Sequence, residues 1–287
     1  MKKTLCIEEY DEIENCISNE EELMEISKKF KVSYDTIFCI SSQMEQNRTK
    51  MILNHHRKSE KMFKYYQLYS GGKTILQIAR KFDLSPTLMA RIILEYHLEL
   101  ANISSLKENE IELLPSFIFK ENKLTKQKVS EYIKDICLIE EQILREQVKE
   151  AIMNDRDYSP FLERIRSNLG IEYEYILKQN LINNNIKYLE ESQLREKGFP
   201  KTPDTKLLVP ITIEGGHVIY WIESKASFGD YSNHKGNMNQ LLGYLERYGP
   251  GIVIYWFGFV EELNKQENSE QKILIFDHFP KSIKTYF

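Results

Sequence analysis

Several features that quickly assign a protein to a class are scarce in this sequence. It contains four cysteines, and no two of them stand in C-x-x-C spacing, so neither a disulfide framework nor a zinc knuckle organises the fold. No apolar run approaches the ~18–20 residues of a membrane span, and the first residues lead into acidic sequence instead of an apolar signal core. We expect a soluble protein of a reducing compartment, the nucleus or the cytoplasm. The cysteines are Cys6, Cys16, Cys39 and Cys137.

An overall excess of positive charge is also missing. The net charge of −4 gives the chain no general attraction to nucleic acid. The charge is unevenly distributed, however, because residues 1–25 hold nine acids and two bases, whereas residues 45–92 hold ten Lys or Arg and three acids. Such a basic segment is typical of a local phosphate-binding surface, and equally of a solvated helix face. Both interpretations stay open.

The length of 287 residues favours two folded units, and 41% hydrophobic content is ordinary for a globular protein. Apolar residues recur at intervals of three and four through the first half, which predicts helices, including a long one from about Lys126 to Met153. The polar stretch from Ser104 to Lys128 predicts turns. Because a proline disfavours helix in the residue before it, Pro160 marks a break. We predict an all-helical domain at residues 1–155 and a second domain at 156–287.

Two segments of the helical half have a helix-turn-helix pattern. In the second, Asp83 and Leu84 form the turn, Ser85 offers an N-cap, and Pro86 occupies the first helical position. An earlier copy has Ser33 as its cap. The second helix of such a unit is the one that enters a major groove, although capped helix pairs are also frequent in proteins that never bind DNA. The candidate DNA contacts that flank the second turn are Arg80, Lys81 and Arg91, whose alternative role is solubility.

The second half changes to an α/β pattern. A helix is expected from about Pro160 to Leu189, and two β-rich runs, 207–213 and 217–226, are separated by a glycine turn that indicates a hairpin. After a further amphipathic helix, the apolar run from Gly251 to Val260 predicts a strand buried on both faces, and residues 273–276 can add another. This pattern predicts a mixed sheet.

The residues that carry chemistry cluster on the predicted hairpin. Asp204 precedes its first strand, and Glu223 and Lys225 lie two apart on the second, so their side chains project from the same face. Hairpin pairing can bring Asp204 alongside them. Two acids and a lysine are costly to bury unless a hard divalent cation compensates. The alternative for Glu223 and Lys225 is a surface ion pair.

These motifs resemble the PD-(D/E)xK nuclease superfamily, whose signature matches Thr202-Pro203-Asp204 and Glu223-Ser224-Lys225. Glu174 occupies the helix in which the superfamily often places a further acidic ligand, and the segment Gln240 to Tyr244 is similar to the Q-x-x-x-Y element of its RecB-like branch. The longer blocks Thr202 to Asp230 and Arg247 to Trp256 resemble the codanin-interacting nuclease family, which is also named for its TPD motif. The resemblance is strongest over residues 158–287.

This resemblance implies a restriction-endonuclease-like fold and Mg²⁺-dependent hydrolysis of DNA, with Mn²⁺ able to substitute. Asp204 and Glu223 would hold the metal ion, and Glu174 would serve a second ion or bind through water. Lys225 would orient the attacking water, and Gln240 would fix the nucleophile or Lys225. Codanin is the implied protein partner.

Two other functions remain in competition. A catalytically silent adaptor would use the nuclease fold as a protein-binding platform, but all the ligand types are present in the sequence. A helix-turn-helix transcription regulator would leave the clustered acids unexplained. Tyr244 is interpreted as a core residue.

Overall fold

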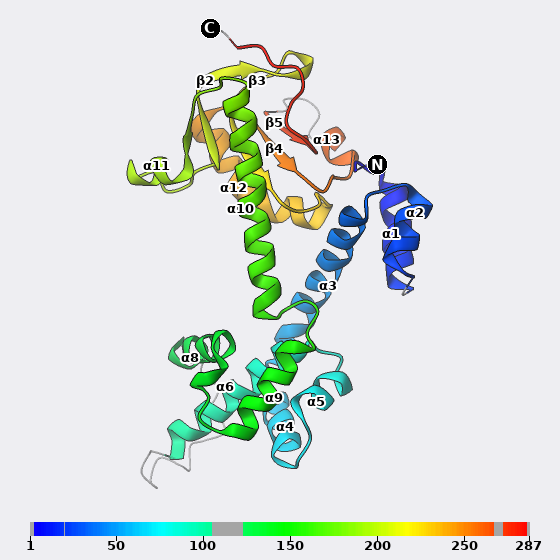
Figure 1. Ribbon diagram of the computed structural model, residues 1–287, viewed down its shortest axis with the longest axis vertical. Helices are drawn as coiled ribbons and strands as arrows, with labels where there is room; N and C mark the ends of the chain where they lie inside the picture. The colour runs from blue at the N-terminus through cyan, green and yellow to red at the C-terminus, as the bar shows by residue number, and fades with distance from the viewer. Residues whose placement is uncertain (1–2, 20, 105–122, 267–271, 286–287) are drawn as a thin grey trace. The chain divides into compact units, whose positions relative to one another are not determined.

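The computed structural model of the protein describes residues 3–19, 21–104, 123–266 and 272–285 (Figure 1). It divides into two compact units. The sheet unit comprises Met1–Met44 and Ser167–Phe287, and the helical unit comprises Glu45–Arg166. Within the described ranges, no helix has the length and apolar character that a membrane span needs.

The sheet unit contains five strands in the order β1-β2-β3-β4-β5. The first three are antiparallel, whereas β3, β4 and β5 run parallel to one another. The mixed sheet and the hairpin that the sequence predicts are therefore confirmed. The strands are β1 (Tyr188–Glu190), β2 (Thr205–Thr212), β3 (Val218–Lys225), β4 (Gly251–Tyr255) and β5 (Ile273–Phe276).

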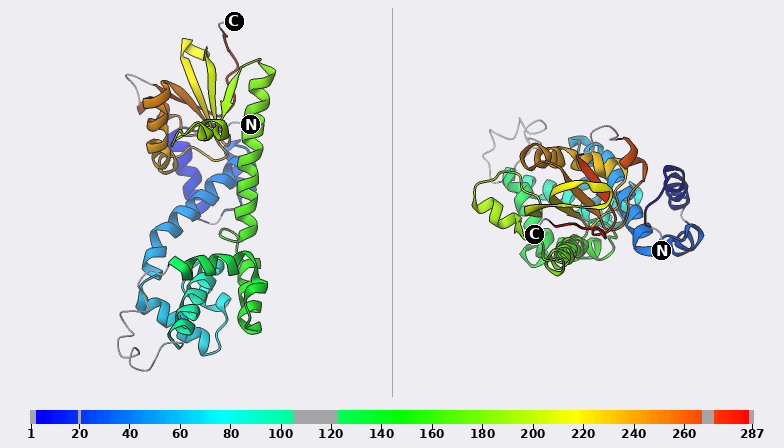
Figure 2. Two further views of the ribbon diagram at one scale, coloured as in Figure 1. Left: turned by 90° about the vertical axis from the view of Figure 1, so that its left-hand side faces the viewer. Right: turned by 90° about the horizontal axis from the view of Figure 1, so that it is seen from above.

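Helices cover both faces of this sheet (Figure 2). Trp221 and Val253 pack with Leu241 of α12 (Tyr231–Tyr248), whereas Ile222 and Ile252 pack with α10 (Pro160–Asn183) on the opposite face. All five residues of β4 are buried, as the continuous apolar run predicts, although the strand ends at Tyr255 and not at Val260. Since side chains alternate along β3, its odd-numbered residues face α12. The shorter elements of the unit are α11 (Glu191–Glu196), η3 (Glu214–Gly216) and α13 (Glu262–Gln266).

The helix predicted to reach Leu189 is shorter than expected. Helix α10 ends at Asn183, Asn185 adopts a left-handed conformation with φ of 56°, and the chain continues into the edge strand β1. Asparagine tolerates this conformation because its short polar side chain bonds locally to the backbone. The three consecutive asparagines at 183–185 were the signal for this end.

The first 44 residues are grouped differently from the predicted division at residue 155. Their helices complete the core on the α12 side of the sheet, where the ring of Tyr10 stacks on Phe228 with centroids 5.6 Å apart. Leu5 also pairs through its backbone with Phe259 and Glu261. Periodicity reveals that a segment is helical, but not which surface it covers. The helices are α1 (Ile7–Ser18), α2 (Leu23–Phe30) and α3 (Tyr34–His56), of which α3 continues into the helical unit.

Both predicted helix-turn-helix pairs are present. Ser33 accepts a hydrogen bond from the backbone N–H of Thr36 at 3.1 Å, and Ser85 accepts one from Leu88 at 3.2 Å. In the second pair, however, most described residues of α6 are buried, and the helix packs against α4, α5, α8 and α9. It is the central helix of its unit, and contact with four other helices leaves little of its described surface for a major groove. The helices are α4 (Ser59–Ser70), α5 (Ile75–Lys81), α6 (Pro86–Ser104), α8 (Lys123–Lys134) and α9 (Gln142–Met153).

The single helix predicted from Lys126 to Met153 is in fact α8 and α9, joined by the 3-10 turn η2 (Ile136–Leu138). The side chain of Asp135 accepts a hydrogen bond from the backbone of Cys137 at 3.0 Å, which favours a turn over helix continuation. The predicted turn-rich stretch between Ser104 and Lys128 lies mostly outside the described residues.

Replacing Ile37 by Ala should destabilise the sheet unit by about 2–5 kcal/mol, because its side chain is 0% exposed in the core beneath α3. The neighbouring Phe38 is 52% exposed, so Phe38→Ala is a matched control that should change stability by less than about 0.5 kcal/mol. Both tryptophans of the chain, Trp221 and Trp256, lie in the sheet unit, so urea unfolding followed by tryptophan fluorescence reports on that unit. A tryptophan transition that Ile37→Ala leaves unchanged would contradict this packing.

Candidate active site

The hairpin register brings Asp204 against Glu223. Thr205 pairs with Ile222, and its hydroxyl donates a hydrogen bond to the Ile222 carbonyl at 3.1 Å. One residue earlier, the backbone N–H of Asp204 donates to Glu223 Oε2 at 3.2 Å. In return, Asp204 Oδ2 accepts the backbone N–H of Ser224 at 2.7 Å. The two carboxylates are therefore held at adjacent positions by each other's strand.

Lys225 and Gln240 complete this cluster. Lys225 Nζ lies 2.8 Å from Glu223 Oε1 and 3.4 Å from Gln240 Oε1, and Gln240 Nε2 donates to the same glutamate oxygen at 3.2 Å. Helix α12 supplies Gln240. Because Glu223 is only 2% exposed, this ion pair differs from the surface pair that was the alternative interpretation.

Tyr244 has a second role besides filling the core. Its ring is buried against Trp221, as expected for a core residue. Its hydroxyl also accepts a hydrogen bond from Gln240 and donates one to the carbonyl of Thr202 at 2.8 Å. Tyr244 thereby ties the Thr-Pro-Asp segment to α12. The spacing of four residues between Gln240 and Tyr244 was the available signal, since it places both on one helix face.

Burial dominates the electrostatics of the two acids. It raises the pKa of Asp204 well above 3.8, and the nearby charge of Glu223 adds to the rise, while the Ser224 N–H opposes it. Burial also raises the pKa of Glu223, against the lowering influence of Lys225. Both carboxyl groups therefore resist ionisation, and a bound cation would favour their charged forms.

The donor set suits a hard divalent cation. Among the described residues, no three Asp, Glu, His or Cys side chains form one metal-binding group. Mg²⁺ is usually bound through one or two carboxylates with its remaining positions filled by water, a requirement that Asp204 and Glu223 meet. Asp204 Oδ1 has no hydrogen-bond partner in the described part of the chain, which leaves it available to a cation. We conclude that these residues fit Mg²⁺.

Two further acids, Glu174 and Glu191, influence the pair through their charge. The charge of Glu174, on α10, contributes to the raised pKa of Asp204, although Glu174 forms no three-acid group with it. Glu191, at the start of α11, accepts a hydrogen bond from the Thr202 hydroxyl at 3.2 Å, and its charge raises the pKa of Glu223. No sequence motif pointed to Glu191.

Comparisons with known proteins identify the family of this chain. A family profile described as "Protein of unknown function TPD sequence-motif" matches residues 140–279. Relatives from Homo sapiens and Bos taurus, both named CDAN1-interacting nuclease 1, are 37% identical over 96% of this chain and 96% of their own length. The chain belongs to the TPD family. A relative of the same name from Danio rerio is 38% identical over 87% of this chain and 79% of its own length. No solved structure matches.

In this TPD-family protein, the N-terminal helices also support the site. Gln43 of α3 accepts a hydrogen bond from the Phe228 N–H at 2.9 Å, donates to the Phe228 carbonyl at 3.1 Å, and donates to Asp230 at 2.7 Å. Asp230 in turn caps α12 by accepting the Asn233 N–H at 2.7 Å. Gln43 therefore fixes the segment between Lys225 and the helix that carries Gln240. Nothing in the local sequence marked it.

The three basic candidates of the second helix-turn-helix pair do not form one cluster. Arg80 and Lys81 are exposed at the end of α5, where Lys81 lies over the Phe82 ring. Arg91 is partly buried, and burial lowers the pKa of its guanidinium, as does repulsion from Arg57. Arg80 and Arg91 line two different pockets of the helical unit.

Replacing Asp204 by Asn should stabilise the metal-free protein, and more so at about pH 8 than at about pH 5. Because the pKa of Asp204 is raised in the folded state, its ionisation costs folding free energy that is absent below about 3.8 and grows as the pH rises through the raised value. An asparagine oxygen can still accept the Ser224 N–H. Thermal unfolding in chelator measures the difference.

The matched control for this experiment is Asp35→Asn, on the exposed start of α3. It should change the unfolding temperature little and equally at both pH values. Lower stability of Asp204→Asn at both pH values would show that the carboxylate is stabilising where it lies.

Proposed function

We propose that this protein is a metal-dependent deoxyribonuclease that also binds a codanin-type partner. Its relatives over nearly the whole chain are named as nucleases that interact with CDAN1. The observation that carries the proposal is the hydrogen-bonded cluster of Asp204, Glu223, Lys225 and Gln240 at one end of the hairpin, in which Glu223 is buried. A structural ion pair would need one acid, whereas this cluster contains two acids whose ionisation burial opposes.

Asp204 and Glu223 would hold Mg²⁺, or Mn²⁺ in its place, and Glu174 would bind through water or assist a second ion. When bound there, the ion supplies polarisation of the phosphoryl oxygen and an acidified water. The protein's contribution is a carboxylate pair whose positions are fixed by reciprocal backbone hydrogen bonds. These contacts need no rearrangement when the ion enters.

Lys225 would stabilise the negative charge that develops on the phosphoryl group during hydrolysis. Its ammonium is the cation of the cluster, and a preset cation stabilises developing negative charge at little reorganisation cost. Glu223 and Gln240 hold this ammonium from two sides, and Tyr244 holds Gln240 in turn. Gln240 and Tyr244 are thus positioning residues, which keep Lys225 directed at the substrate.

The first helix-turn-helix pair favours a protein partner over DNA. The start of α3 exposes Tyr34 and Phe38, whose rings stack on each other, and residues 34–43 contain no Lys or Arg. Exposed, stacked aromatic side chains are typical of protein contacts, and the basic residues Lys28, Lys29 and Lys31 lie before this segment, at the end of α2. This supports a codanin-type partner on the same unit that holds the nuclease site.

The wild-type protein should cut DNA in the presence of Mg²⁺ or Mn²⁺, and Asp204→Ala and Lys225→Ala should each lower the rate by at least roughly a hundredfold. Single-stranded, duplex, splayed and junction DNA are compared in one gel assay. Glu246→Ala, an exposed acid on α12, is the matched control and should cut like the wild type. Equal cutting by all variants would assign the activity to a contaminant and remove the support for this site.

Mg²⁺ should raise the unfolding temperature of the wild type in a concentration-dependent way, because an ion that binds only the folded state stabilises it. Asp204→Asn should lose this shift. Lys225→Gln should keep it, since Lys225 repels the cation and does not ligate it. A shift of equal size in Asp204→Asn would place the bound ion elsewhere on the protein.

A further inference from the structure

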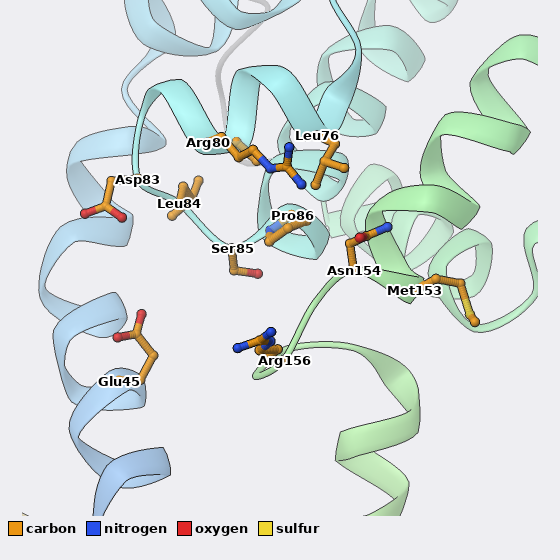
Figure 3. A pocket seen from close by; sticks show the side chains of 11 residues that line it. Glu45, Leu76, Arg80, Asp83, Leu84, Ser85, Pro86, Met153, Asn154 and Arg156 are labelled. Atoms are coloured by element: carbon orange, nitrogen blue, oxygen red, sulfur yellow. The ribbon is translucent and has the colours of Figure 1, made fainter. Parts of the chain in front are cut away.

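A pocket of about 560 Å³ lies at the turn of the second helix-turn-helix pair, entirely within the helical unit. Figure 3 shows Arg80 from the end of α5 and Arg156 from the α9–α10 connection at this pocket, with Ser85 between them in the view. Asp83 and Glu45 lie on the other side. The volume is in the range of pockets that enclose small organic ligands.

The acidic side chains of this pocket have ion-pair partners, whereas its arginine side chains do not. Glu45 and Asp83 are both paired with Arg48, at 3.3 Å in the case of Glu45. The side chains of Arg80 and Arg156 are exposed and have no hydrogen bond or ion pair within the described ranges. The acidic side is therefore neutralised inside the protein, whereas two guanidinium groups face the pocket without a hydrogen-bonded anion.

The pocket wall that carries Arg156 is fixed in place. The buried carboxylate of Asp155 accepts hydrogen bonds from the backbone of Thr87 at 2.8 Å and from the N–H groups of Asp157 and Tyr158 at 2.8 Å each. Asp155 thereby occupies the N-terminus of α6 and attaches the α9–α10 connection to it. The anion-binding groups that remain are the side chains of Arg80 and Arg156, because the side-chain amide of Asn154 already donates to the Glu150 carbonyl at 2.9 Å.

We propose that this pocket binds the phosphate of a nucleotide, either free or at the end of a nucleic-acid strand. A terminal phosphate carries more charge than a phosphodiester and can accept hydrogen bonds from two guanidinium groups. Apolar side chains of Leu76, Leu84 and Met153 line the same pocket and can cover a sugar or a base. A concave site suits a strand end better than a continuous backbone. The proposal rests on the proposed nuclease function only in choosing a nucleotide over other phosphate esters.

The test measures binding by the full chain in chelator, so that no cleavage occurs. Short fluorescent single strands with a 5′-phosphate, a 3′-phosphate or only hydroxyl ends are compared by anisotropy. The wild type should bind one phosphorylated end about tenfold more tightly than the hydroxyl end. Arg80→Gln and Arg156→Gln should each remove this preference. Arg164→Gln, an exposed arginine outside the pocket, should keep it.

Competition with free adenosine monophosphate distinguishes the two sources. Displacement of the strand by the free nucleotide at similar concentrations assigns the site to nucleotides in general, and failure to displace it assigns the site to strand ends. Either result supports the proposal. Equal affinity for phosphorylated and hydroxyl ends, equal losses in all three arginine variants, or tighter binding of a phosphoserine peptide would overturn it.

Two variants distinguish a failure of the proposed phosphate pocket from a failure of the proposed nuclease site. Asp204→Ala should abolish the cutting of closed circular DNA, which has no ends, and should leave the end preference of the binding assay intact. Arg156→Gln should leave the cutting of closed circular DNA intact and should abolish the end preference.

Discussion

The structure depends on two carboxylates, Asp204 and Glu223, that the β2–β3 hairpin brings together. The Glu223 carboxylate accepts the backbone N–H of Asp204, and the Asp204 carboxylate accepts the backbone N–H of Ser224, so the hairpin register holds both side chains in place. Burial raises the pKa of both groups, which means that the fold tolerates an unfavourable arrangement at this point. Unfavourable charge retained at a fixed geometry is characteristic of functional sites, because a ligand or a transition state supplies the missing compensation.

Much of the remaining sheet unit can be understood as support for this pair. A continuous set of contacts leads from Gln43 through Asp230 to α12, and from α12 through Gln240 to Lys225. Tyr244 closes the set by bonding the carbonyl of Thr202. The N-terminal helices are thus part of the core of the sheet unit and of the contacts that support the candidate site, although more than one hundred residues separate them from the sheet in the sequence.

The two helix-turn-helix pairs show that one local pattern can have different surroundings. The second helix of the first pair exposes aromatic side chains, whereas α6 of the second pair is enclosed by four other helices. A capped turn between helices therefore defines a local geometry and not a DNA-binding surface. In the second pair, the accessible charged feature is the pocket beside the turn, where Arg80 and Arg156 lie.

The sequence by itself determined the local elements of this protein. Ser33 and Ser85 marked helix starts, the glycine turn marked the hairpin, and the two-residue spacing of Glu223 and Lys225 placed both side chains on one face. Only the tertiary structure decided that the first 44 residues join the sheet, that α6 is buried, and that Gln43 and Tyr244 support the site. Capping and strand alternation act within a few residues, whereas burial and hydrogen bonds between distant segments depend on which surfaces meet when the chain folds.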